Sequence, residues 1–282
     1  MHDGGPAASP LGRPWLSLPR PATARDTALV CFPYAGSSAA CYRAWSPMLP
    51  EHLVIGVELP GHGARLAEPV TEHLEEVADS VLPHVLRLPA DRLILFGHSM
   101  GGLLAYEVTR RLEAAGRAPE WLVVSGTGAP HLPRCIPPVR HLATEEFLPA
   151  AVRLGLADPA LAESAELARI FGPVLRADLI LAESHAHRPG VPLVTPATVL
   201  GGTADPYVPQ DDLHAWRALT AHAPDVKLLP GGHMFIEEHR AEVLAIIRAF
   251  RAGRRGADPP GLSSSGGATV SRRRRGSFLP GR

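Results

Sequence analysis

Short apolar runs alternate along the chain with longer stretches in which apolar residues recur at helical spacing. Each run leads into a turn marked by glycine or proline, and such runs are typical of strands that a sheet buries on both faces. The predicted strand-and-turn segments are 28–36, 53–63, 92–101, 120–128, 196–206 and 226–233.

Helical spacing marks the segments 72–88, 101–115 and 237–250. The repetition of strand, turn and helix requires crossover connections, so we predict an α/β fold whose central sheet is mostly parallel and flanked by helices. In such sheets, ligands bind at the carboxyl ends of the strands, where these glycine turns lie.

The composition fits one large domain followed by a tail of different character. With 282 residues, 45% of them hydrophobic, the chain can bury a substantial core as a single domain. From Ala252 onward, seven arginines stand against one aspartate, so the tail carries +6 and residues 1–251 carry −6. The tail is rich in proline, serine and glycine, a composition that cannot offset the entropy of ordering. We therefore predict a domain over 1–251 and a disordered basic tail over 252–282.

Other features exclude several classes of protein. Cys31, Cys41 and Cys135 show no CxxC spacing, which favours a reducing compartment over disulfides or a zinc site. No apolar run is long enough for a signal peptide or a membrane span. Arginines 272–275 lack the interleaved aromatic residues of a nucleic-acid site. We expect a cytoplasmic monomer that uses no metal or cofactor and binds neither nucleic acid nor membrane.

The segment LILFGHSMGG, residues 93–102, places a serine where a predicted strand turns into a predicted helix. Gly97, Ser99 and Gly101 fit the pattern G-x-S-x-G, which in this context is typical of a nucleophile elbow. The two glycines let strand and helix pass closely, and the sharp turn holds the serine hydroxyl above the sheet. The alternative is a glycine turn whose serine only caps the helix.

A serine nucleophile needs a base, and the base needs an orienting group. With this elbow, the chain order is serine, acid, histidine. His233 follows the last predicted strand in a loop with two glycines, and Asp205 ends the strand before it. We therefore predict Ser99, Asp205 and His233 as a catalytic triad. Other candidates are interpreted as caps, surface residues or packing residues: Asp211, Asp212, Asp225, His84, His185, His187 and His222.

The tetrahedral intermediate of acyl transfer needs donors for its negative oxygen. The backbone N–H of Met100, directly after the serine, is one predicted donor, and the loop at 32–37 is expected to supply the other. Between the strands that end at 125 and begin at 196 lies a segment too long for a simple crossover. Asp158 and Pro159 open a helix there that we expect to run toward Phe171. We therefore predict a helical lid over about 131–190, the alternative being a packed crossover without motion.

Five motifs occur together in this chain: Phe32-Pro33-Tyr34-Ala35-Gly36, Glu58-Leu59-Pro60-Gly61, Phe96-Gly97-His98-Ser99-Met100-Gly101, Gly201-Gly202-Thr203-Ala204-Asp205-Pro206 and Pro230-Gly231-Gly232-His233. In combination they resemble the type II thioesterases, the free-standing editing enzymes of polyketide and nonribosomal peptide assembly lines, which belong to the α/β-hydrolase superfamily. The resemblance covers about residues 15–250.

The resemblance implies Ser99 as nucleophile, Asp205 and His233 as its partners, and the amides of Ala35 and Met100 as the oxyanion hole. Two departures from the family pattern leave the triad untouched. Ser37 stands where the family commonly has glycine, and residues 126–128 replace a more basic stretch.

The implied activity is hydrolysis of acyl thioesters from the phosphopantetheine arm of acyl or peptidyl carrier proteins, which clears stalled or misprimed units during antibiotic biosynthesis. We expect the lid to shape the acyl pocket, and carriers to dock on a patch that includes Arg134 and Arg140. The alternatives are a medium-chain fatty acyl carrier-protein thioesterase, a general esterase and a catalytically silent carrier-binding protein.

Overall fold

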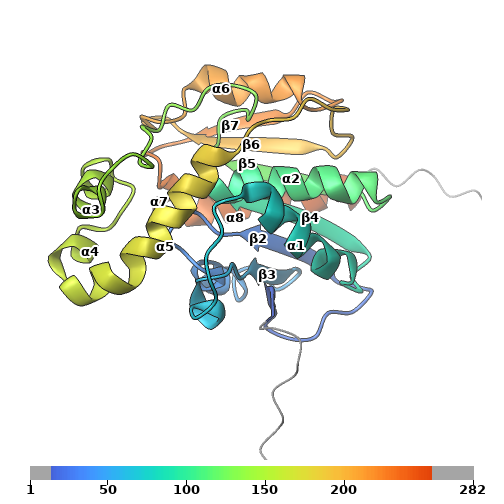
Figure 1. Cartoon of the computed structure of the whole chain (residues 1–282). Helices are drawn as coiled ribbons and strands as arrows, with labels where there is room; N and C mark the ends of the chain where they lie inside the picture. The colour runs from blue at the N-terminus through green and yellow to red at the C-terminus, as the bar shows by residue number, and fades with distance from the viewer. Residues whose placement is uncertain (1–13, 256–282) are drawn as a thin grey trace, which may run out of the picture.

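A seven-stranded sheet runs through residues 14–255, the part of the chain that the computed structural model describes (Figure 1). Its strand order is β1-β3-β2-β4-β5-β6-β7. All neighbouring strands are parallel except β1, which runs antiparallel to β3. The predicted α/β fold with a mostly parallel sheet is confirmed. The strands are β1 (Leu16–Ser17), β2 (Thr27–Phe32), β3 (Leu53–Val57), β4 (Arg92–His98), β5 (Trp121–Ser125), β6 (Ala197–Gly202) and β7 (Asp225–Leu229).

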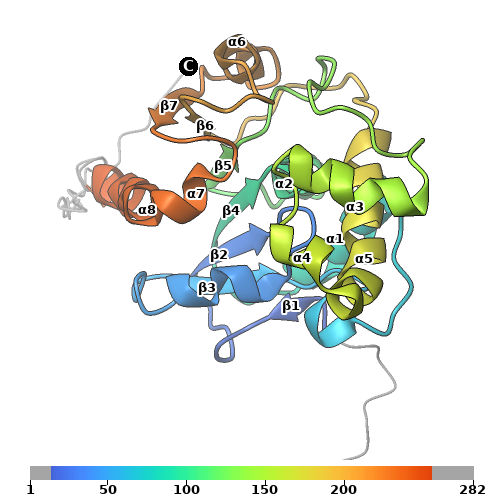
Figure 2. The same ribbon diagram turned by 90° about the vertical axis from the view of Figure 1, so that its left-hand side faces the viewer.

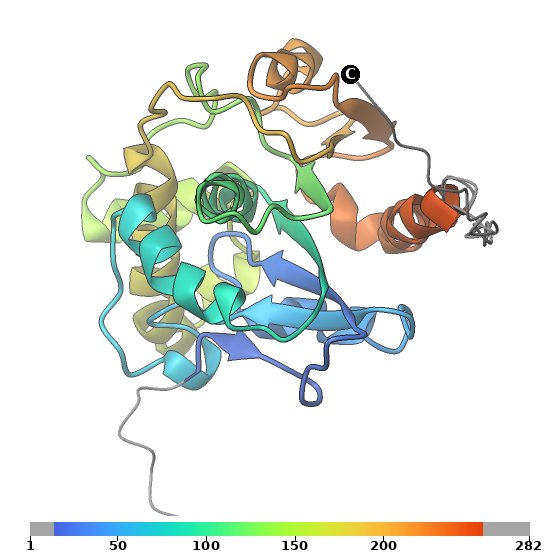
Figure 3. The same cartoon turned by 90° about the vertical axis from the view of Figure 1, so that its right-hand side faces the viewer.

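Helices cover both faces of this sheet. Alternate residues of β2 point to opposite sides: Ala28 and Val30 join a core cluster with α1 and α2, whereas Leu29 and Cys31 join one with η1 and α8. Figure 3 shows α1 and α2 on one side of the strands and α8 on the other. The helices are η1 (Ala39–Trp45), η2 (Gly63–Arg65), α1 (Leu74–Leu86), α2 (Met100–Ala114), α3 (Thr144–Arg153), α4 (Pro159–Glu163), α5 (Ala165–Ser184), α6 (Gln210–His214), η3 (Ala215–Ala218), α7 (Phe235–Glu238) and α8 (Arg240–Arg255).

The predicted insertion between β5 and β6 contains α3, α4 and α5, which gather at one end of the molecule (Figure 2). Asp158 caps α4 as predicted, because its Oδ1 accepts a hydrogen bond from Ala160 N at 2.9 Å. The predicted continuous helix toward Phe171 is interrupted, however. Ser164 takes an extended backbone and caps α5 instead, its side chain accepting from Leu167 N.

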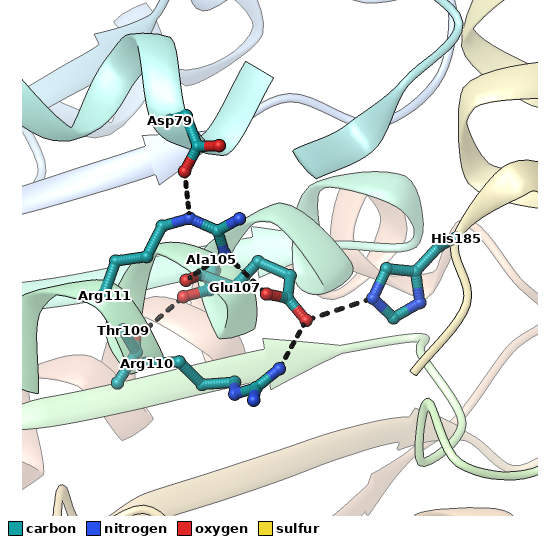
Figure 4. Close-up of polar contacts among 7 residues, drawn as sticks. All are labelled: Asp79, Ala105, Glu107, Thr109, Arg110, Arg111 and His185. Atoms are coloured by element: carbon teal, nitrogen blue, oxygen red, sulfur yellow. Dashed lines mark hydrogen bonds and ion pairs between the residues drawn. The ribbon is translucent and has the colours of Figure 1, made fainter. Parts of the chain in front are cut away.

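A charged cluster centred on the buried Glu107 fastens the end of α5 to α2 (Figure 4). Glu107 of α2 lies 3.1 Å from His185 Nε2, just after α5, and accepts from Arg111 at 2.6 Å and Arg110 at 3.2 Å. Burial disfavours the charged carboxylate, but the hydrogen bonds from His185 and Arg111 outweigh it and lower the pKa of Glu107 to about 2. His185, which we predicted to be a surface or packing residue, therefore holds the insertion in place.

The C-terminal boundary differs from the prediction. α8 continues to Arg255, so residues 252–255, which we assigned to the tail, extend this helix. The rest of the predicted tail, 256–282, lies outside the described residues. Within 14–255, no helix is long and apolar enough to cross a membrane.

Candidate active site

The turn between β4 and α2 holds Ser99 in a strained backbone conformation. Ser99 has φ 53° and ψ −118°, and within residues 14–255 it is the only non-glycine residue with positive φ. A Cβ on Gly97 would lie 1.9 Å from Gly101 O, and one on Gly101 would lie 2.2 Å from Phe32 O. Since both distances are far below van der Waals contact, only glycine fits at either position, and the sharp turn follows from the sequence.

The three predicted triad residues meet above this turn. His233 Nε2 lies 2.9 Å from Ser99 Oγ, and His233 Nδ1 lies 2.8 Å from Asp205 Oδ2. The Asp205 side chain is fully buried, and its Oδ1 accepts from Tyr207 N at 2.9 Å. Because a carboxylate accepts, Nδ1 carries the imidazole proton and Nε2 is left to accept from the serine hydroxyl.

Two loops at the carboxyl ends of β6 and β7 bring the acid and the base together. Ala204 N donates to Gly231 O at 2.9 Å. A Cβ on Gly202 would lie 2.5 Å from Gly232 O, so glycine at 202 permits this close approach. The glycines that mark these turns in the sequence therefore position Asp205 beside His233.

A cavity of about 510 Å³ opens beside Ser99 and His233. Its volume lies in the usual range of small-molecule sites, roughly 300–1,000 Å³. The walls come from the loop after β2, from the helical insertion and from the loop after β7. The insertion supplies mainly apolar side chains: Leu156, Leu161, Phe171, Leu175 and Leu179.

The two predicted amide donors lie next to the serine. Ala35 and Met100 line a second, small cavity of about 10 Å³ together with Ser99. The start of α2 approaches the loop after β2 because Gly101 lacks a Cβ, which would meet Phe32 O. The residues after β2 and the residue after Ser99 thus converge on one point.

The family model described as "Thioesterase domain" matches residues 27–251. The chain belongs to the thioesterase family. Linear gramicidin dehydrogenase LgrE of Brevibacillus parabrevis is 34% identical, covering 83% of this chain and 91% of its own. Thioesterase PikA5 of Streptomyces venezuelae is 35% identical over 81% of this chain and 82% of its own. The solved structure of the type II thioesterase BorB, from the borrelidin biosynthetic cluster, is 35% identical, with a TM-score of 0.77 over 83% of this chain and 96% of its own.

These comparisons confirm the resemblance to type II thioesterases and the assignment as a hydrolase of thioester bonds. The name of LgrE denotes a redox enzyme, whereas the family model, PikA5 and BorB denote thioester cleavage. Linked serine, histidine and aspartate side chains are suited to acyl transfer, so the geometry of this thioesterase agrees with the second description.

A second histidine of the thioesterase site, His98, was not predicted. Its ring lies 5.2 Å from that of His233, and its Nδ1 lies 3.0 Å from Ser125 Oγ. Burial, followed by the nearby His233, holds the pKa of His98 well below its usual range. The ring is therefore neutral and packs against His233 without placing a positive charge beside it.

The remaining predicted residues lie at different distances from the thioesterase cavity. Arg134 lines the small cavity beside Ser99, whereas Arg140 is exposed in the insertion. Asp211 and Asp212 lie in the first turn of α6, and Asp225 begins β7, so none of these contacts the triad.

Proposed function

We propose that Ser99, His233 and Asp205 carry out thioester hydrolysis as nucleophile, base and orienting acid. The observation that supports this most strongly is the chain of two hydrogen bonds from Ser99 Oγ through His233 to Asp205. The neutral His233 ring accepts at Nε2, which is the state that a base needs before the reaction begins.

In the first half-reaction, Ser99 Oγ attacks the thioester carbonyl carbon while His233 Nε2 takes the hydroxyl proton. The carbonyl oxygen becomes negative, and the N–H groups of Ala35 and Met100 donate to it. The carbon–sulfur bond then breaks, and His233 returns its proton to the departing thiolate. The products are a thiol and an acyl ester on Ser99.

In the second half-reaction, His233 takes a proton from water, and the resulting hydroxide attacks the acyl ester. The ester bond breaks, the proton returns to Ser99 Oγ, and the carboxylic acid leaves. Asp205 stays ionised throughout and stabilises the imidazolium that forms twice.

We propose that the natural substrates are acyl groups on the phosphopantetheine arm of acyl or peptidyl carrier proteins, and that the enzyme edits an assembly line. The relatives of this chain include proteins named for gramicidin S, anguibactin and yersiniabactin biosynthesis. The helical insertion acts as a lid whose apolar wall receives the acyl chain. The exposed Arg134, close to Ser99, is suited to meet the negative charge of the arm or carrier.

A fluorophosphonate probe tests the nucleophile directly. We expect one covalent label on Ser99, located by mass spectrometry, and none in the Ser99→Ala variant. The matched control is Ser17→Ala, which removes an exposed hydroxyl of β1 away from the cavity and should leave labelling intact. A label on any other residue of the native enzyme would contradict the proposed triad.

The cavity also favours a second candidate, a medium-chain acyl thioesterase. A volume of about 510 Å³ with apolar walls does not restrict the site to short chains. Hydrolysis rates for a series of acyl lengths on carrier protein separate the two functions, since an editing enzyme should favour short, misprimed groups.

A further inference from the structure

A buried carboxylate of the insertion reaches into the loop that carries Ala35. Asp178 of α5 is 3% exposed, and its Oδ2 accepts a hydrogen bond from Gly36 N at 2.7 Å. The same oxygen lies 2.9 Å from His62 Nε2. Gly36 directly follows Ala35, so one side chain of α5 holds the peptide next to a proposed oxyanion donor.

His62 supplies the charge that balances Asp178. Its Nδ1 lies 2.9 Å from Pro60 O, and since a carbonyl only accepts, that nitrogen carries a proton. Burial opposes a second proton, but the Asp178 carboxylate, the Pro60 carbonyl and Glu58 together outweigh it and raise the pKa of His62. The pair is therefore close to neutral, which matters because an unbalanced carboxylate here would oppose the negative charge of the tetrahedral intermediate.

The loop that carries Ala35 is a tight turn. Ser37 N donates to Tyr34 O at 3.0 Å, which closes a four-residue turn over 34–37. Gly36, at its third position, has φ 75°, and a Cβ there would lie 2.9 Å from Leu175 Cδ1. The bond from Gly36 N to Asp178 holds the central peptide of this turn, which joins Ala35 to Gly36.

We propose that Asp178 is a positioning residue for the oxyanion hole. It holds the turn at 34–37 so that the Ala35 N–H points at the reacting carbonyl, and His62 cancels its charge. Leu175 and Leu179 lie on either side of Asp178 along α5 and line the acyl cavity, so the same helix contacts the acyl chain and the turn. This inference rests on the proposed triad and oxyanion hole.

The first test is the Asp178→Ala variant, assayed with an acyl thioester. We expect kcat to fall by ~10²–10³, the loss typical of one misplaced oxyanion donor, while KM stays within about threefold. The affinity for a trifluoromethyl ketone, which adds the serine hydroxyl to form an oxyanion, should fall by a similar factor. Asp178→Asn keeps an oxygen acceptor for Gly36 N, so its kcat should be at least tenfold higher than that of Asp178→Ala.

Two further variants separate positioning from folding. Leu181→Ala removes a buried side chain of α5 that lies in the main core, so it should lower Tm but keep kcat within about threefold. The double variant His62→Leu/Asp178→Leu replaces the ion pair by apolar groups, a change often neutral for stability, yet it leaves Gly36 N without its acceptor. We expect this variant to fold and to lose as much kcat as Asp178→Ala.

The outcomes distinguish the role of Asp178 from that of the triad. The role of Asp178 would be overturned if the double variant kept the native kcat. It would also be overturned if Leu181→Ala, with the same Tm as Asp178→Ala, lost as much kcat as that variant. A wrong assignment of the triad would be seen in a different variant, because Ser99→Ala would then still hydrolyse thioesters or react with the fluorophosphonate. In the Asp178 variants, prolonged labelling should still reach Ser99 completely.

Discussion

The chemistry proposed for this thioesterase depends on single side chains whose positions the backbone fixes tightly. Ser99 is held by a turn that only glycine neighbours permit, and His233 is held by a fully buried carboxylate. The proposed nucleophile and base therefore need little reorganisation before the reaction.

Substitutions of the three triad residues should lower kcat by unequal factors. In Ser99→Ala no other group can form the acyl-enzyme, so we expect kcat to fall on the order of 10⁶, whereas Asp205→Asn, which leaves the base misoriented, should cost roughly 10⁴. Steady-state hydrolysis of an acyl-N-acetylcysteamine thioester measures both. Equal and mild effects would refute the assignment.

Gly97 should tolerate no side chain. In Gly97→Ala the new Cβ would meet Gly101 O at 1.9 Å, so β4 and α2 must separate and both activity and stability should collapse. Gly116→Ala is the control: Gly116 has φ 75° but open space around it, so alanine there costs about 1 kcal/mol from backbone strain and leaves kcat unchanged. Thermal melts and kcat together separate the two mechanisms.

The sequence predicts some of these residues and not others for a physical reason. Ser99, Asp205 and His233 each end a strand in a glycine turn, and parallel strands bring such ends to one edge. Asp178 lies in the middle of a helix and meets His62, 116 positions away, only through the packing of that helix. His98 is adjacent to the nucleophile, but its neutral state depends on burial that no local pattern reveals.

At the scale of elements, the attachment of α5 to α2 through Glu107 should make part of the stability depend on pH. Glu107→Gln removes a buried charge that His185 and two arginines contact, and we expect a loss of about 2 kcal/mol at pH 7. Asp79→Asn is the matched control, because Asp79 contacts the same Arg111 but its side chain is 67% exposed, so the loss should be below about 0.5 kcal/mol.

The sign of the pH dependence follows from the lowered pKa. Glu107 titrates near 2 in the folded state instead of its ordinary 4.5, so its contribution is complete above pH 4.5 and disappears as the pH falls toward 2. The native enzyme and Glu107→Gln should therefore differ less in their free energy of unfolding at pH 3 than at pH 7, and urea unfolding measures both values. A gap that widens in acid would contradict the assigned cause.

The elements themselves were predicted where their pattern is long. Strands β2 to β6 are built on short apolar runs, and α1 and α2 show clear helical spacing. β1 has only two residues, too few for any periodicity, and its pairing with β3 is a tertiary event. The break at Ser164 was missed because the apolar spacing continues across it, while the serine captures Leu167 N instead.

At the scale of the whole molecule, substrate choice should depend on the carrier as well as on the acyl group. Contacts remote from the scissile bond can orient the carbonyl, so we expect acetyl and propionyl groups on a carrier protein to show higher kcat/KM than the same groups on N-acetylcysteamine. Decanoyl groups on the carrier protein and on N-acetylcysteamine complete the comparison. If decanoyl on the small thiol is hydrolysed as fast as acetyl on the carrier protein, the medium-chain or general esterase function is the better account.

The strained backbone at Ser99 has a consequence for how this enzyme can evolve. A non-glycine residue in such a conformation costs roughly 1–3 kcal/mol, and glycine would relieve most of that cost despite its larger unfolded-state entropy. We expect Ser99→Gly to melt about 2–4 °C above Ser99→Ala and both variants to be inactive. The difference between the melting temperatures of these two variants measures how much folding stability the strained backbone at residue 99 costs. In relatives that are no longer selected for hydrolysis, we expect glycine to replace the serine at this position. Such proteins should be more stable but without catalytic activity.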